Sequence, residues 1–395
     1  MEAHENTLDI SAYAREAVEH RRTLHAHPEP SFEEHATQQY ITRYLQGLGL
    51  QPSPIAGTGV TTLIRGTRGT ADGKVLLLRA DIDALRVTED TGLPFASQNP
   101  GVMHACGHDG HMGTLLAVTH WLVDHRDQFG GTVKLLFQPA EEISPGGAEP
   151  CVQAGILHDP DVTFVFGMHL WNSFEFGKVG LREGPLMAES DRFALTITGR
   201  GAHAAMPHLG ADPIVAAAQI VTALQTIVSR ETNPLASRVV TIGTIDGGAA
   251  FNVIPQSVHM TGTLRALSRA DAEAGAASLR RIATHTAEAL GTTADLDYAF
   301  GYPPVINSRD SVAFLRPILQ EAVGMDNVVE PEISMAGEDF AYYLEQVPGA
   351  FIFVGTRNPA KGLTEPQHSP HYTFDEDIFP TALSAFIAVV KGYLV

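Results

Sequence analysis

The first 186 residues alternate between two spacings of hydrophobic positions. In three segments apolar side chains recur every three to four residues, which predicts helices over 12–26, 33–46 and 110–127. Three short runs are apolar at nearly every position, as expected for strands buried on both faces: 74–79, 132–137 and 162–167. Strands that alternate with helices favour an α/β fold with a mostly parallel mixed sheet and flanking helices.

The pattern changes near residue 187. Residues 193–198 alternate between apolar and polar positions, as a half-buried strand does. A helix, two strands and a helix are then predicted over 212–229, 238–245, 257–265 and 269–290. The α/β pattern returns after residue 300, with a strand at 350–354 and a final helix from 377. We therefore expect a discontinuous α/β domain, 1–186 and 301–395, interrupted by an inserted α+β domain, 187–300.

Polar side chains that can bind metal follow the predicted strands of the first domain. Asp81 and Asp83 follow the first strand, Glu141 and Glu142 the second, and His169 the third. In open α/β sheets ligands bind beyond the carboxyl ends of the strands, so we expect these side chains to converge on one crevice. Taken one at a time, paired glutamates are more often a solvated loop, and a lone histidine is more often a core residue.

The segment Cys-Gly-His-Asp-Gly-His at 106–111 adds two further candidates. Cys106 and His108 lie two residues apart on the loop that leads into the predicted helix, where both can contact one ion. The alternative for Cys106 is a small buried hydrophobic residue. His104 and His111 are interpreted as supporting or structural residues.

His368, in Gln-His-Ser-Pro-His-Tyr, completes the predicted ligand set, and His371 is its rival. Glu142 is taken as a ligand and Glu141 as the carboxylate that exchanges a proton with water and substrate. Asp83 can orient a ligating imidazole by accepting its second N–H. For Asp81 the options stay open: it can act in the same way, or it can face the sheet edge or cap a turn.

Composition and charge exclude several other classes. Hydrophobic residues make up 44% of the chain and charged residues 18%, an ordinary globular mixture. The net charge of −19 argues against nucleic acid and anionic membrane as partners. Two cysteines, Cys106 and Cys151, do not make a disulfide scaffold. The first residues lack a signal-peptide pattern, and no apolar run approaches the roughly 18 residues of a membrane span, so we expect a cytoplasmic protein.

Other catalytic classes fit less well. A Gly-x-Ser-x-Gly nucleophile elbow is lacking, as is a Gly-x-Gly-x-x-Gly dinucleotide motif after the first strand. A thiol–imidazole pair of Cys106 and His108 would leave Glu142, His169 and His368 unexplained. A metal-dependent hydrolase is therefore the first hypothesis.

The motifs resemble those of the aminoacylase/hippurate hydrolase branch of the dinuclear metallopeptidases, which include carboxypeptidase- and deacylase-type enzymes. The resemblance covers nearly the whole chain. Its motifs lie at 79–85 (Arg-Ala-Asp-Ile-Asp-Ala-Leu), 106–111, 138–142 (Gln-Pro-Ala-Glu-Glu), 167–169 (Gly-Met-His), 199–208, 252–255 (Asn-Val-Ile-Pro) and 337–340 (Gly-Glu-Asp-Phe). Two departures, Arg86 and Ile143-Ser-Pro, flank the expected metal cleft and leave the substrate preference open.

The resemblance implies hydrolysis of N-acyl amino acids by an enzyme with two divalent ions per subunit. It assigns Cys106, His108, Glu142, His169 and His368 as ligands, Glu141 as general base and acid, and Asp83 as a carboxylate that orients a ligand. It also implies that the inserted domain mediates dimerisation. His203 would reach the active site of a partner subunit and bind the developing oxyanion, while Asn252 and Arg265 would help to hold the substrate.

Three questions stay open at this point. The ion can be zinc, manganese, cobalt or nickel, because the set contains both a thiolate and carboxylates. A dipeptidase or carboxypeptidase of the same architecture is an alternative, and so is a non-catalytic protein that binds amino-acid conjugates. The acyl group is not determined by any residue that the motifs contain.

Overall fold

Two sheets, each with its own hydrophobic core, organise the chain in the computed structural model, which describes residues 10–395. The first unit comprises Met1–Leu186, Ile306–Glu332 and Asp339–Val395, and the second comprises Met187–Val305 and Ile333–Glu338. The chain leaves the first unit in β7 (Gly184–Met187) and returns in β14 (Val305–Asn307). The N-terminal segment on which the lack of a signal peptide was argued lies outside the described residues.

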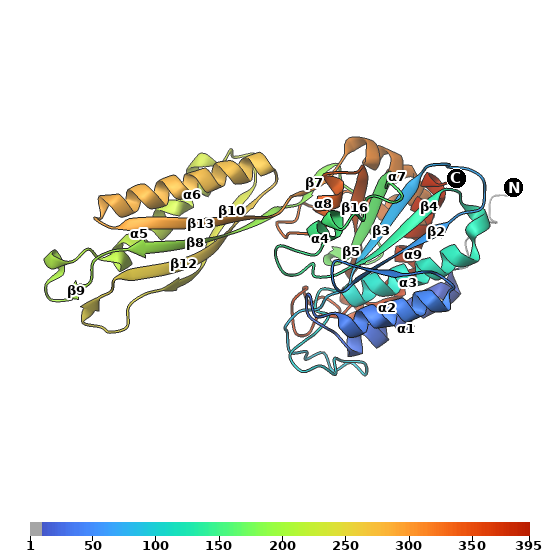
Figure 1. Cartoon of the computed structure of the whole chain (residues 1–395), viewed down its shortest axis with the longest axis horizontal. Helices are drawn as coiled ribbons and strands as arrows, with labels where there is room; N and C mark the ends of the chain where they lie inside the picture. Colours follow the sequence, from blue (N-terminus) through green and yellow to red (C-terminus); the bar gives the residue numbers. More distant parts are fainter. Residues whose placement is uncertain (1–9) are drawn as a thin grey trace. The chain divides into compact units, whose positions relative to one another are not determined.

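The sheet of the first unit has eight strands in the order β1-β2-β4-β3-β5-β16-β6-β15 (Figure 1). Their bounds are β1 Ser53–Ile55, β2 Gly59–Arg65, β3 Val75–Asp81, β4 Thr132–Gln138, β5 Phe164–Glu175, β6 Val179–Gly180, β15 Val328–Val329 and β16 Gly349–Arg357. The central pairs β4–β3, β3–β5 and β5–β16 are parallel, whereas β1, β2 and β6 pair antiparallel with their inner neighbours. This confirms the predicted α/β fold with a mostly parallel sheet.

Helices cover this sheet because their apolar faces require a partner. The bounds are α1 Ser11–Ala26, α2 His35–Gly47, α3 His108–Asp124, α4 Ala148–Gln153, α7 Arg309–Val323, α8 Ala341–Leu344 and α9 Phe379–Tyr393. Helix α3 contacts α1, α9, β3 and β5, which explains why it is buried along nearly its whole length. It begins at His108, two residues earlier than predicted, so that His108 lies in its first turn.

The second unit is a four-stranded antiparallel sheet with two helices. The strands lie in the order β10 (Arg238–Asp246), β12 (Ser257–Ala266), β8 (Glu189–Thr198) and β13 (Thr293–Tyr302). Helices α5 (Pro213–Thr226) and α6 (Arg269–Ala289) pack their apolar faces on the alternating buried residues of the sheet. A short ribbon of β9 (Ala202–His203) and β11 (Val253–Ile254) completes this unit. Strand β13 was not predicted from the sequence.

One helical stretch, Pro213–Glu231, is long and apolar enough to cross a membrane. It is α5 continued by a π turn and corresponds to the helix predicted over 212–229, although no apolar run of membrane-spanning length was expected. Its residues Ala216, Ile220 and Leu224 are fully buried in the core of the second unit. We therefore interpret it as a core helix of that unit.

Candidate metal centre

The candidate site lies where β3 and β4 end and β5 continues. Strand β3 pairs with β5 only as far as Arg79 and Gly167, whereas β5 runs on beside β16 to Glu175. His169 is therefore inside β5, not after it as predicted, but at a point that β3 no longer covers. Asp81 is the last residue of β3, not after the strand as predicted, and Asp83 follows at the same edge, so one crevice forms beyond the shorter strands.

The turn into α3 brings Cys106 to His169. The Sγ atom of Cys106 is 3.3 Å from Nε2 of His169. Gly107 between the two candidates has a φ of 94°, and a Cβ there would lie 2.8 Å from the hydroxyl of Tyr372. Glycine is thus required for both the left-handed backbone and the close approach of the tyrosine.

The hydrogen bonds determine which nitrogen of each histidine faces the crevice. Nδ1 of His169 lies 2.9 Å from the carbonyl of Leu170, and Nδ1 of His108 lies 2.9 Å from the carbonyl of Asp83 and 3.2 Å from its carboxylate. Because these oxygens only accept, each Nδ1 donates, and in the neutral ring each Nε2 carries a lone pair. Asp83 thus orients His108 in the way that ligating histidines require.

Glu142 links this pair to the C-terminal part of the first unit. Its Oε1 is 3.8 Å from Nε2 of His108 and 3.4 Å from Nε2 of His368. Its backbone N–H donates to the Asp83 carboxylate at 2.9 Å. Glu141 lies beside Glu142 and His108, and its side chain is 7% exposed.

The donor atoms of the predicted ligands and Glu141 form three overlapping groups, each within 4.8 Å. They are Cys106–His108–His169, Cys106–Glu142–His368 and His108–Glu141–Glu142. Nε2 of His108 and Oε1 of Glu142 are buried and have no hydrogen-bond partner, which is costly unless a cation binds both. Thiol, imidazole and carboxylate donors match transition-metal ions such as zinc and manganese. The residues therefore fit the divalent cations that the sequence predicted.

The charge around the thiol also favours a cation. Burial raises the pKa of Cys106 well above its ordinary value, and the carboxylates of Glu142, Glu141 and Asp81 raise it further. A thiol in this environment stays protonated in the absence of positive charge. A bound divalent ion reverses that balance, because a coordinating thiol is deprotonated.

Hydrogen bonds or burial account for the remaining histidines without a metal. Nδ1 of His111 donates to Asp81 at 2.6 Å and its Nε2 accepts the N–H of Leu170 at 2.9 Å, so no lone pair is left for a metal. His371 lies with Nδ1 2.6 Å from the carbonyl of Asp90. Burial lowers the pKa of His104 to about 4, which makes it a neutral core residue at physiological pH.

The three candidates of the inserted domain lie at two places in the second unit. His203 pairs with Val253 in the β9–β11 ribbon, and the carbonyl of Asn252 accepts the N–H of Ala204. Arg265 lies near the other end of β12, opposite Ser190. Since Ser257, at the ribbon end of β12, and Arg265 are eight residues apart, about 26 Å of strand separates the two places. One copy of this unit thus does not bring all three to one substrate.

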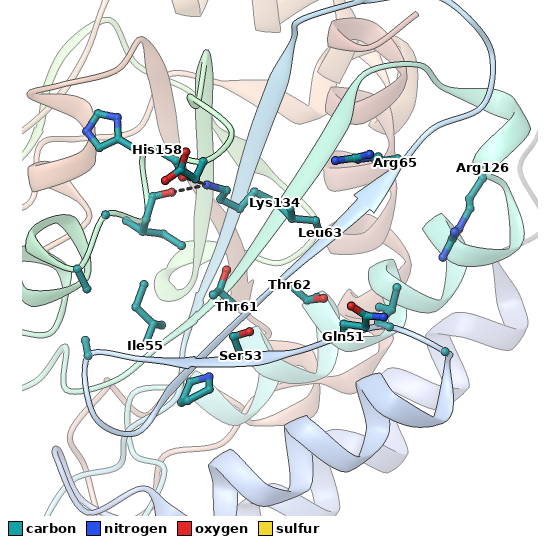
Figure 2. Close-up of a pocket in the computed structure, with 18 residues that line it drawn as sticks. Gln51, Ser53, Ile55, Thr61, Thr62, Leu63, Arg65, Arg126, Lys134 and His158 are labelled. Atoms are coloured by element: carbon teal, nitrogen blue, oxygen red, sulfur yellow. Dashed lines mark hydrogen bonds between the residues drawn. The ribbon is translucent and has the colours of Figure 1, made fainter.

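A broad groove elsewhere in the first unit contains none of these residues. Figure 2 shows it over β1, β2 and β4, with Ser53, Thr61 and Arg65 in its wall. The cavity volume is about 780 Å³. The ammonium of Lys134 also faces the groove, but donates to the carbonyls of Ile156, His158 and Pro160. All three N–H groups of this lysine are thereby used, so it supports a loop and offers no free cation.

Four buried polar residues near the crevice had been given no role from the sequence. The hydroxyl of Ser31 donates to Asp83 at 2.6 Å, while Arg79, Gln138 and Asp339 form a network behind the ligands. The available signal for Arg79 was a charge at the end of an apolar run. Gln138 and Asp339 lie in two of the motifs that carry the family resemblance, but their partners are distant in the sequence and no role followed from it. Ser31 has no signal of either kind.

Comparison with known proteins adds independent findings. A sequence model of the peptidase family M20/M25/M40 matches residues 77–392. N-acetyl-L-cysteine deacetylase of Bacillus subtilis is 41% identical over 372 residues, 94% of this chain and 86% of that protein. IAA-amino acid hydrolase ILR1-like 4 of Arabidopsis thaliana is 38% identical over 379 residues, 95% and 84% of the two chains. The solved structure of Bacillus subtilis YXEP protein, a dinuclear metal binding peptidase from the M20 family, has a TM-score of 0.82 and 36% identity, covering 97% of this chain and 99% of that chain.

Proposed function

The chain belongs to peptidase family M20/M25/M40, and from that membership we propose that it hydrolyses the amide bond of N-acyl amino acids. The products are a carboxylic acid and a free amino acid, as from a hippurate-like substrate. The observation that carries the proposal is the set of five donors, two of them buried atoms with no hydrogen-bond partner, with Glu141 beside them. The names of the two relatives support this substrate class, since both refer to amino acids that carry an added group.

We assign two divalent ions per subunit, of zinc, manganese, cobalt or nickel, to the donors of Cys106, His108, Glu142, His169 and His368. When bound, such ions lower the pKa of the attacking water and polarise the amide carbonyl. The task of the chain is to present unprotonated donors at this place. The hydrogen bonds of His108 and His169 through Nδ1 support that assignment, because they leave both Nε2 lone pairs available.

Glu141 is the residue we assign to proton transfer. Its carboxylate lies within 4.8 Å of the donor atoms of His108 and Glu142, so it is in reach of a water at the same place. It accepts a proton from the attacking water and returns it to the nitrogen of the leaving amine. Its burial keeps bulk water from competing for that proton.

The inserted domain supplies the other substrate contacts in this proposal. We assign His203 as the donor to the developing oxyanion, and Asn252 and Arg265 to the amino-acid part of the substrate, whose carboxylate an arginine can bind in a bidentate manner. About 26 Å of strand separates Arg265 from the other two within one unit, so we propose that a second copy of the chain contributes His203 and Asn252. The functional form is accordingly a homodimer or a higher homo-oligomer.

The test is a pair of matched substitutions assayed with a panel of substrates. Glu141→Gln should lower turnover of hippurate by about 10²–10⁴-fold, because it removes the proton acceptor, while the metal content stays that of the parent. Glu149→Gln, on nearby α4, is the control and should leave turnover unchanged. The enzyme is reconstituted with each of the four metals before assay, and metal is counted by elemental analysis.

The panel separates the alternatives. It contains N-acetyl and N-benzoyl amino acids and a dipeptide with a free amine. Release of amino acid from the acylated compounds supports the proposal, and cleavage of the dipeptide alone would assign a dipeptidase instead. Binding of the conjugates with no product from any compound would assign a binding protein. Normal turnover by Glu141→Gln would refute the mechanism.

We place the enzyme in the cytoplasm, with small molecules as its ligands. Cys106 and Cys151 are both buried as free thiols, which suits a reducing compartment. The acidic balance of the chain gives no surface for nucleic acid or anionic membrane.

A further inference from the structure

A connected set of buried polar side chains lies behind the candidate ligands. Its members are Arg79, Asp81, His111, Gln138 and Asp339, each no more than 2% exposed. They come from β3, α3, β4 and the segment before α8, all within the first unit. None of them is assigned to metal or substrate above. Buried charges of this kind are costly, so their arrangement requires an explanation.

Asp339 holds both ends of the loop that carries the two glutamates. Its carboxylate accepts the N–H groups of Gly147 at 3.0 Å and Ala148 at 2.9 Å, directly after the loop. It also accepts Nε2 of Gln138, the last residue before the loop, at 2.8 and 2.9 Å. The two ends meet closely, because a Cβ at Gly147 would be 1.8 Å from the carbonyl oxygen of Pro139. The position of Glu141 and Glu142 therefore depends on a carboxylate about 200 residues away in the chain.

Arg79 connects Asp339 to a second chain of hydrogen bonds. Its guanidinium donates to Asp339 at 2.8 Å, to Gln138 at 2.9 Å and to Asp81 at 2.6 Å. Charge-assisted bonds of this kind to planar partners have a defined geometry. The loop and the end of β3 are thus fixed relative to one another.

His111 carries the connection to His169. Asp81 accepts the Nδ1–H of His111 at 2.6 Å, and Nε2 of His111 accepts the N–H of Leu170, the residue after His169, at 2.9 Å. A backbone N–H can only donate, so the tautomer of His111 and the direction of both bonds are determined. Rotation of β5 at this point would break the bond to His111.

We propose that Asp339 and His111 are positioning residues at the two ends of one buried network centred on Arg79. The network fixes the Glu141–Glu142 loop and the His169 backbone relative to each other, so that the base and the ligands lie at the correct spacing. This inference goes beyond the proposed reaction. Of its tests, only the kinetic one depends on that reaction. A displacement of about 1 Å in such a site can cost on the order of 100-fold in rate.

Asp339→Asn is the first test, because the four groups described above all donate hydrogen bonds to Asp339. An amide of the same size places an NH₂ group where an oxygen now accepts. At the Oδ2 position it would face the N–H groups of both Gly147 and Ala148, and at the Oδ1 position it would face the guanidinium of Arg79. We expect kcat to fall by roughly 10–100-fold with KM within about threefold. In the metal-free protein, hydrogen exchange of the amides of residues 140–148 should become faster.

His111→Asn tests the other end. The new amide can still donate to Asp81 but no longer accepts the N–H of Leu170. We expect about 10–100-fold weaker binding of cobalt, followed by calorimetry, and a changed visible spectrum of the bound ion, which reports ligation by His169. Both measurements are independent of any substrate, so they stand even if the proposed reaction fails.

The control is Asn307→Asp in the same unit. Asn307 is buried, and its amide donates to the carbonyls of Arg182 and Phe351. This substitution therefore also places two groups of the same kind against each other, here a carboxylate oxygen against carbonyl oxygens, and it leaves the side-chain volume unchanged. It should lower the unfolding midpoint while leaving kcat, loop exchange and cobalt binding unchanged. If Asp339→Asn and His111→Asn behave as Asn307→Asp does, or if neither folds, the network serves stability alone and the proposal is overturned.

Discussion

The choice between His368 and His371 gives a sharp test of the metal centre. Both side chains are about half exposed, at 56% and 51%, so replacement of either removes little packing. Only His368 lies beside Glu142, whereas His371 bonds to the carbonyl of Asp90. His368 has a φ of 67°, which asparagine tolerates better than alanine, so we compare His368→Asn with His371→Asn.

The size of the effect follows from mass action. A metal at 100 times its dissociation constant stabilises the parent by about 2.7 kcal/mol. Loss of the His368 ligand should weaken binding by about 100-fold or more, which leaves about 0.4 kcal/mol of that stabilisation. In the presence of a chelator, the unfolding free energy of His368→Asn should match that of the parent within about 1 kcal/mol. The reason is that a half-exposed ion pair between His368 and Glu142 contributes little.

The assay is calorimetric titration of manganese into the metal-free proteins, followed by urea unfolding with and without the ion. His371→Asn should bind and respond as the parent does. Equal losses in the two variants, or a greater loss in His371→Asn, would refute the placement of His368 among the ligands. A parent protein that gains no stability from any of the four metals would refute the centre itself.

Two further predictions concern stability. Burial favours a raised pKa for Glu16, but the nearby imidazole of His20 and the hydrogen bonds with Tyr44 and His120 outweigh it and lower the pKa to about 2. Solvent reduces the resulting stabilisation to about 1 kcal/mol. It is present above the ordinary pKa near 4.5 and is lost as the pH falls towards 2. The unfolding free energies of the parent and of Glu16→Gln, measured in urea, should therefore converge over that range. Lys134→Met should cost about 2–4 kcal/mol in the same assay, because three carbonyls lose their donor; a loss below about 0.5 kcal/mol would contradict this.

Hydrophobic patterns predicted the central strands well because these strands are buried on both faces. All seven residues of β3 are buried, which gives an uninterrupted apolar run up to Arg79. The edge strands could not be predicted in this way. Strands such as β6 and β15 have two residues each and exist only because a neighbour pairs with them. The full length of β5 likewise depends on β16, about 185 residues further along the chain.

The family resemblance drawn from the motifs is confirmed by the match over residues 77–392 and by the relatives. The roles of individual residues stay predictions, although the structure brings the five candidate ligands and Glu141 together. The network of Asp339 could not be read from the chain in advance. Its acceptor and donors are separated by 191 to 260 residues, and nothing in the local pattern around Gly-Glu-Asp-Phe indicates their pairing.

The narrow neck of the 139–147 loop has a consequence for enzyme engineering. Its ends are joined through Gly147 and Pro139, and its exposed tip contains Ile143, one of the departures from the family motif. Substitutions at the tip change none of the residues that anchor the loop. Variants at 143–146 should therefore alter the exposed tip and leave the bonds that anchor the loop in place.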